Sequence, residues 1–215
     1  DVSDEERLQG LIRLLRDSDL EHLAWNEASR RFRERAALMG SLQDDWPDFS
    51  LAGLADDLET WLVPYLHDVT RLADLRRVDV LAALRARLTW SRQQTLDTWL
   101  PERIELPSGS TARVDYSQHP PVLAAKLQEL FGWETSPTLA GGRLAVVVHL
   151  LSPAGRPLQV TQDLAGFWRS GYEAVKKEMK GRYPRHPWPD DPLTAPATPH
   201  TKKRQAGGTG PPKRQ

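Results

Sequence analysis

Residues 103–116 read RIELPSGSTARVDY, and apolar side chains alternate with polar ones on both sides of a Pro-Ser-Gly-Ser turn. A period of two residues is typical of a half-buried β-strand, and a short turn rich in proline, serine and glycine joins two such strands into a hairpin. The sequence therefore predicts strands at 103–106 and 111–116. Before Pro101 the apolar residues recur every three or four positions, so the architecture changes near residue 100.

The expected order of elements is strand, strand, helix, and then strand, strand, helix again. The apolar spacing at 122–130 predicts a short amphipathic helix, and the apolar run at 144–151 predicts a central strand. A Ser-Pro-Ala-Gly turn then leads to a strand at 158–160, and a helix is predicted over 162–180 with Thr161 as its N-cap. The expected fold class is α+β, with a ββαββα domain at 101–192 that has a four-stranded sheet and two helices on one face.

Residues 1–100 form the expected N-terminal helical subdomain. Apolar positions predict a first helix through 8–15 and a second over 20–36, for which Asp17, Ser18 and Asp19 are available as caps. Ser50 and Asp79 each precede a further stretch with helical spacing. A last helix is predicted over 89–99, because Pro101 cannot continue it.

Charge is balanced over the whole chain, with 29 basic and 29 acidic side chains, but it is unevenly distributed. Residues 1–163 carry 18 basic and 25 acidic side chains, whereas residues 164–215 carry 11 and 4. This asymmetry is typical of a region that meets phosphate or an acidic surface. Residues 193–215 are rich in proline, glycine, lysine and arginine and poor in apolar side chains, so they are predicted to be an extended, disordered basic tail.

The helix predicted over 162–180 combines an apolar stripe with a set of cations away from it. The stripe consists of Leu164, Trp168, Tyr172, Val175 and Met179. The candidate nucleic-acid-binding residues are Arg169, Lys176, Lys177, Lys180, Arg182 and Arg185. Several cations presented together bind phosphates without reading sequence, because each contact releases counterions. The alternative interpretation is an amphipathic helix that docks on the sheet and keeps its lysines in water.

Motifs for catalysis are missing from the sequence. It contains no GxxxxGK followed by Ser or Thr for nucleotide phosphates, no histidine pair one helical turn apart for zinc, and no GxSxG nucleophile elbow. The absence of cysteine excludes thiolate metal sites. The chain itself is therefore expected to be no enzyme and to hold no cofactor or metal. An acidic start and the lack of any apolar run of roughly 20 residues predict a cytoplasmic protein without a signal peptide or membrane span.

Several strings, in order along the chain, resemble one known family. They are LPSGS (106–110), LQELFG (127–132), HLLSPAGRP (149–157), QVTQDLAGFW (159–168) and HPWPDDP (186–192). Over roughly residues 100–192 the sequence is similar to the C-terminal domain of bacterial HrpB-type DEAH-box ATP-dependent helicases. Because the first residue is not methionine, the chain is expected to be a fragment of such a protein.

The resemblance implies that RecA-like motor domains, which bind ATP and magnesium, lie elsewhere in the polypeptide. This chain would then be a non-catalytic accessory region whose partners are the motor domains and single-stranded nucleic acid, either RNA or DNA. The alternative function is a protein-interaction or structural platform. Support for it comes from an acidic cluster of Asp44, Asp45, Asp56, Asp57 and Glu59 and from the Pro187-Trp188-Pro189 segment.

Overall fold

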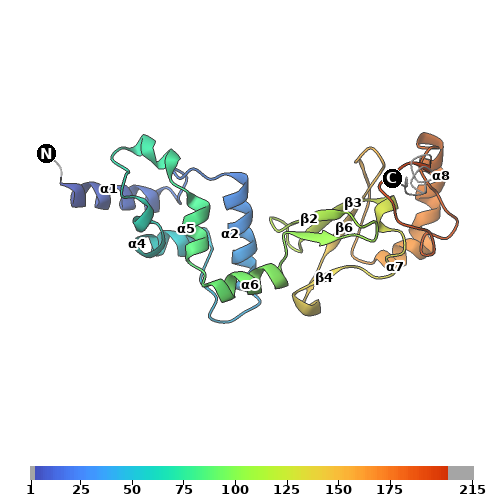
Figure 1. Ribbon diagram of the computed structural model, residues 1–215, viewed down its shortest axis with the longest axis horizontal. Helices are drawn as coiled ribbons and strands as arrows, with labels where there is room; N and C mark the ends of the chain where they lie inside the picture. The colour runs from blue at the N-terminus through green and yellow to red at the C-terminus, as the bar shows by residue number, and fades with distance from the viewer. Residues whose placement is uncertain (1–2, 203–215) are drawn as a thin grey trace, which may run out of the picture. The chain divides into compact units, whose positions relative to one another are not determined.

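The chain folds into two compact units that meet in the sequence between Leu100 and Pro101 (Figure 1). The structure is a computed structural model and describes residues 3–202. Each unit has a buried apolar core of its own: Leu15 and Leu84 are fully buried in the first unit, and Leu123 and Val148 in the second. Because burial of apolar surface is the main stabilising term in folding, each unit has its own source of stability.

Helices build the described part of the first unit. They are α1 (Asp4–Asp17), α2 (Glu27–Met39), α3 (Leu51–Asp56), α4 (Leu58–Trp61), η1 (Val63–Tyr65), η2 (Leu72–Arg77), α5 (Val80–Ala86) and α6 (Trp90–Trp99). The predicted caps at Ser50 and Asp79 are confirmed, since each side chain accepts a hydrogen bond from a backbone N–H three residues later. Thr89 caps α6 in the same way.

The predicted start of the second helix is wrong. The sequence pattern places it near Leu20, but Asp19 and Leu20 have φ values of 48° and 67°, which a right-handed helix does not allow. Leu20 is nevertheless fully buried, so its apolar signal comes from a turn that packs into the core. The helix begins at Glu27 because Asn26 accepts a hydrogen bond from the Ser29 N–H and Ser29 Oγ accepts one from the Asn26 N–H.

The second unit contains a five-stranded mixed sheet instead of the predicted four-stranded one. Its strands are β1 (Arg103–Glu105), β2 (Thr111–Asp115), β3 (Val122–Lys126), β6 (Val147–Leu151) and β7 (Pro157–Thr161), in that spatial order. The pair β3–β6 is parallel and the other pairs are antiparallel. Two short strands, β4 (Thr138–Leu139) and β5 (Leu144–Ala145), form a separate ribbon, so the apolar run at 144–151 is divided between β5 and β6.

The extra strand is β3, which occupies residues for which the sequence pattern predicts a helix. Leu123 and Ala125 are buried whereas Ala124 is exposed, the alternation of a strand. A parallel register with β6 pairs every residue of β3, from Val122 opposite Val147 to Lys126 opposite Leu151. The helical signal came from Leu127 and Leu130, which belong to a following 3-10 turn, η3 (Leu127–Leu130). The predicted ββαββα unit is therefore wrong.

One long helical segment follows the sheet. It consists of α7 (Leu164–Gly166), a π-helical turn η5 (Phe167–Gly171) and α8 (Tyr172–Arg182). Its N-cap is Asp163, whose carboxylate accepts a hydrogen bond from the Gly166 N–H at 2.8 Å, and not Thr161 as predicted. Trp168 and Tyr172 pack against Phe131, with ring centroids 6.2 and 6.3 Å from that of Phe131. These aromatic contacts attach the helical segment to Phe131, the residue that follows η3.

The chain beyond α8 is held against the second unit as far as the structure describes it. The Tyr172 hydroxyl donates to the Pro189 carbonyl at 2.8 Å, and the Gly132 N–H donates to the Pro192 carbonyl at 3.0 Å. Thr198, whose N–H donates to the Gln128 carbonyl, is buried. Residues 193–202, which the sequence assigns to the tail, therefore pack on the domain. The rest of the predicted disordered tail, 203–215, lies outside the described residues.

Candidate nucleic-acid interface

The apolar stripe predicted for the last helix faces the core of the second unit. Leu164, Trp168, Tyr172 and Met179 are buried, and Val175 is half-buried. Burial raises the pKa of the Tyr172 phenol, and the negative charges of Glu173 and Asp190 raise it further. The stripe therefore fixes which side of α8 remains available for a ligand.

Four of the six candidate cations are exposed and form no ion pair within residues 3–202. They are Arg169, Lys177, Lys180 and Arg185. Lys177 and Lys180 are three residues apart on α8, which makes them neighbours on the helix surface. Arg182 is also exposed, but its guanidinium lies 3.5 Å from the Glu178 carboxylate. Lysine and arginine near the C-terminal end of a helix are favoured by its dipole.

Lys176 differs from the other five candidates. Its side chain is buried, and its ammonium lies 2.6 Å from the Asp190 carboxylate and 3.2 Å from that of Glu173. The hydrogen bond to Asp190 is the main reason that the pKa of Lys176 is raised, and the same contact lowers the pKa of Asp190. The structure thus places Lys176 as an anchor between α8 and the segment that follows it, and its charge is already balanced.

A cavity of about 480 Å³ lies between the β6–β7 turn and the C-terminal end of α8. We call it the turn cavity; its lining includes Ser152, Arg156, Pro157, Met179, Arg182 and Tyr183. Arg156 is absent from the set of cations predicted from the sequence, because the sequence presents it only as the end of a turn. The signal that could have found it is its position directly after the Ser-Pro-Ala-Gly turn that ends the predicted central strand.

Two further side chains, His186 and Lys126, lie near Tyr183 of the turn cavity. The His186 ring lies 6.2 Å from the Tyr183 ring, centroid to centroid, in an edge-on arrangement. Burial lowers the pKa of His186, and the positive charge of Lys126 lowers it further, so Lys126 lies close to this imidazole. Lys126 is the last residue of β3. Lys126 therefore adds a cation near His186, and the lowered pKa of His186 favours its neutral form.

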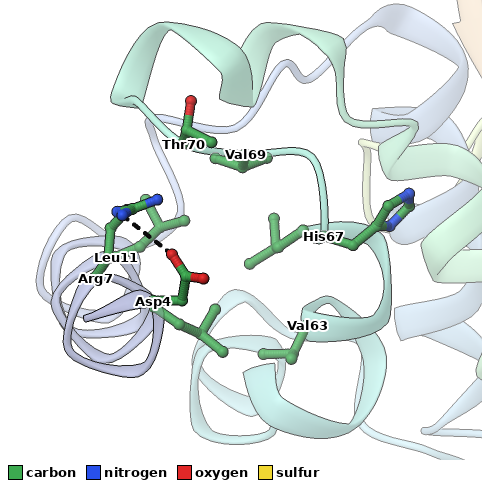
Figure 2. Close-up of a pocket in the computed structure, with 9 residues that line it drawn as sticks. Asp4, Arg7, Leu11, Val63, His67, Val69 and Thr70 are labelled. Atoms are coloured by element: carbon green, nitrogen blue, oxygen red, sulfur yellow. Dashed lines mark ion pairs between the residues drawn. The ribbon is translucent and has the colours of Figure 1, made fainter.

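The first unit carries a different kind of hollow, shown in Figure 2. This α1 groove, of about 440 Å³, lies between α1 and residues 63–70, and Leu8, Leu11, Val63 and Leu66 give it an apolar lining. The ion pair of Arg7 with Asp4, at 3.1 Å, borders it. Beside it lies a smaller hollow lined in part by the exposed side chains of Leu14 and Leu72.

The acidic cluster predicted from the sequence is partly neutralised within the first unit. Asp57 pairs with Arg87 at 2.8 Å, and Glu59 pairs with Arg16 at 3.2 Å. The remaining members, Asp44, Asp45 and Asp56, are exposed. Because two of its five acidic side chains are ion-paired, the cluster has less unpaired negative charge than its composition indicates.

Over residues 3–202 no three histidine or acidic side chains gather in a way that could hold a metal ion. Within the same residues, every helix is too short or too polar to cross a lipid bilayer.

Residues 61–192 match the protein family described as ATP-dependent helicase C-terminal, HrpB_C. The chain belongs to the HrpB_C family.

The relatives of this HrpB_C chain are bacterial helicases. It is 44% identical over 204 residues to the ATP-dependent RNA helicase HrpB of Escherichia coli strain K12, and the alignment covers 94% of this chain and 25% of that protein. A crystal structure of the E. coli DExH-box NTPase HrpB superposes with a TM-score of 0.84 at 42% identity, over 94% of this chain and 25% of that one. A crystal structure of the E. coli DEAH/RHA helicase HrpB gives a TM-score of 0.71 at 41% identity, over 86% and 24%.

This HrpB_C chain thus spans about a quarter of the length of the relatives that it matches. It has the sequence and the fold of the C-terminal region of an HrpB-type ATP-dependent helicase. The HrpB_C match contains the whole five-stranded sheet, the turn cavity and all six candidate cations. It leaves out α1, α2 and α3, although these helices contribute to the core of the first unit.

Proposed function

We propose that this chain is a non-catalytic accessory region of an ATP-dependent RNA helicase and that it contacts nucleic acid through the C-terminal end of α8. ATP and magnesium would then be bound by motor domains elsewhere in the polypeptide. The match to a quarter of a protein named as an ATP-dependent RNA helicase supports this assignment. It is also supported by the lack of a phosphate-binding GxxxxGK motif in the sequence.

The observation that carries the nucleic-acid contact is the set of exposed, unpaired cations at one end of α8. Lys177, Lys180 and Arg185 are exposed and form no ion pair within residues 3–202, so each can neutralise a backbone phosphate without first breaking a protein contact. Each neutralised phosphate releases counterions, so affinity and its dependence on salt both grow with the number of contacts. Lys176 no longer belongs to this set, because Asp190 and Glu173 already balance its charge.

The test is charge reversal of Lys177 and Lys180 together, with binding to fluorescein-labelled single-stranded RNA measured at several salt concentrations. The double variant Lys177→Glu/Lys180→Glu should weaken binding by about tenfold or more at low salt and should reduce the salt slope by about 1.4. The matched control is Arg13→Glu/Arg30→Glu, which changes the net charge equally at exposed sites of the first unit. If both double variants lose affinity equally, binding is only a consequence of net charge.

The alternative function, a platform for another protein or for the motor domains, is favoured by the α1 groove. Its apolar lining and the nearby exposed side chains of Leu14 and Leu72 are features of a surface that is covered in an assembly. The binding experiment, repeated with single-stranded DNA, separates the two functions. A wild-type chain that binds neither RNA nor DNA at low salt would exclude the nucleic-acid contact and leave the platform as the function supported by the structure.

A further inference from the structure

The turn cavity has the size of a small-ligand site. Its volume of about 480 Å³ falls within the range of roughly 300–1,000 Å³ that is usual for pockets that bind small molecules. It lies where β6 ends and the chain turns toward β7, and it is closed on the other side by α8. The cavity is therefore formed by the secondary structure of the second unit.

The charged lining of the turn cavity consists of two arginines, Arg156 and Arg182, and one carboxylate, Glu178. Arg156 is exposed and forms no ion pair within residues 3–202. Arg182 faces the same cavity, and its pairing with Glu178 at 3.5 Å is loose, with both side chains more than half exposed. Glu178 also lines the cavity, so a phosphate would have to compete with its carboxylate for Arg182, whereas Arg156 starts without an ion-pair partner among the described residues. A guanidinium presents two parallel N–H donors and so suits a phosphate group.

An aromatic ring and apolar side chains complete the lining. The half-buried ring of Tyr183 lies at the cavity, and Pro157 and Met179 add apolar surface. Single-stranded nucleic acid is commonly held by cations along its backbone together with aromatic rings that stack on its bases. A base can enter such a hollow only when it is unpaired, because a base in a duplex is stacked between its neighbours.

We propose that the turn cavity is a nucleotide subsite for single-stranded nucleic acid, in which Arg156 and Arg182 contact a backbone phosphate and Tyr183 stacks on a base. This inference rests on the nucleic-acid contact proposed above. It specifies in addition where a single nucleotide of the strand binds. Arg182 belongs both to the cavity lining and to the candidate cations, so the subsite adjoins the C-terminal end of α8.

The experiment uses the full 215-residue chain and a fluorescein-labelled oligouridylate of about 12 nucleotides, within the usual range of single-strand site sizes. Arg156→Ala should weaken binding about fivefold and Tyr183→Leu about tenfold, whereas Tyr183→Phe, which keeps the ring, should stay within about twofold of wild type. The control for Arg156 is Arg113→Ala, which removes an exposed arginine from β2 and should also stay within about twofold. An RNA duplex measured in parallel should respond to none of the cavity variants.

The outcomes separate the subsite from the function on which it rests. If the wild-type chain binds the oligouridylate and Arg156→Ala behaves like Arg113→Ala, the subsite is excluded while the contact through Lys177 and Lys180 stands. Equal losses for Tyr183→Leu and Tyr183→Phe would exclude base stacking. No binding by the wild-type chain would exclude both proposals. Arg156→Ala keeps the hydrogen bond from the Ser152 N–H to the carbonyl of residue 156 and the one from the N–H of residue 156 to Ser152 Oγ, so the turn is expected to remain folded.

Discussion

Lys176 and Lys177 are adjacent in the sequence, yet the structure gives them different environments. Lys177 is exposed and unpaired within residues 3–202, whereas Lys176 is buried and bound to Glu173 and Asp190. Asp190 lies fourteen residues further along the chain, in a segment that returns over α8. Because the Tyr172 hydroxyl also binds this segment at Pro189, the two contacts together hold the chain after α8 in position.

The Asp190 contact predicts a pH dependence of stability. The pKa of Asp190 is lowered in the folded state, so the stability from this carboxylate is fully present above its unfolded pKa of about 3.9. It is lost as the pH falls through the lower, folded-state pKa. Asp190→Asn should therefore lower the midpoint of thermal unfolding at pH 7, and its deficit relative to wild type should disappear in acid.

Glu134→Gln is the control for Asp190→Asn, because it removes one negative charge from an exposed side chain of the same unit. Thermal unfolding of the three proteins from pH 7 down to about pH 2, followed by circular dichroism, provides the measurement. One contrary outcome is that the two variants lower the unfolding midpoint equally at pH 7, and another is that the loss caused by Asp190→Asn is the same at every pH. Either result would show that the contact between Lys176 and Asp190 contributes no specific stability.

At the scale of elements, β3 shows how a strand can be hidden in a sequence with helical spacing. Alanine and lysine, which make up most of β3, are good helix formers, and Leu127 and Leu130 follow at helical intervals. The choice of a strand is made by β6 and β2, which pair with β3 on its two sides. Tertiary pairing of this kind routinely overrides local propensity.

Threonine substitutions at two adjacent alanines test this assignment. Ala125 is buried, so Ala125→Thr should overpack the core and cost about 1–3 kcal/mol of unfolding free energy. Ala124→Thr, at an exposed position of the same strand, should stay within about 0.5 kcal/mol of wild type. Denaturant unfolding measures both. In the helix predicted from the spacing, Ala125 would face solvent, so a neutral Ala125→Thr would contradict the strand.

At the scale of the whole molecule, the chain divides into two units with separate cores. The HrpB_C match begins at residue 61, inside the first unit, whereas the structural division falls between Leu100 and Pro101. The start of the family match and the boundary between the two compact units therefore differ. A fragment designed on the match alone would keep part of the core of the first unit without α1, α2 and α3.

The division predicts that residues 101–215 fold without the first unit. The five-stranded sheet, the aromatic cluster around Phe131 and the anchored segment after α8 all belong to this fragment. Its thermal unfolding should be a single cooperative transition, and its NMR spectrum should show the dispersion of a packed core. The fragment 61–100 serves as the comparison and should be unfolded alone, because most of its partners in the first unit are absent. A disordered 101–215 fragment would contradict the division.

The sequence by itself determined the features that depend on neighbouring residues. The hairpin at 103–116, the caps at Ser50 and Asp79, the apolar stripe of the last helix and the family all follow from short-range patterns. Tertiary structure alone decided that β3 is a strand, that Asp190 neutralises Lys176, and that Arg156 and Tyr183 line one cavity. These outcomes depend on pairing between distant segments, and such pairing leaves no periodic signal in either segment alone.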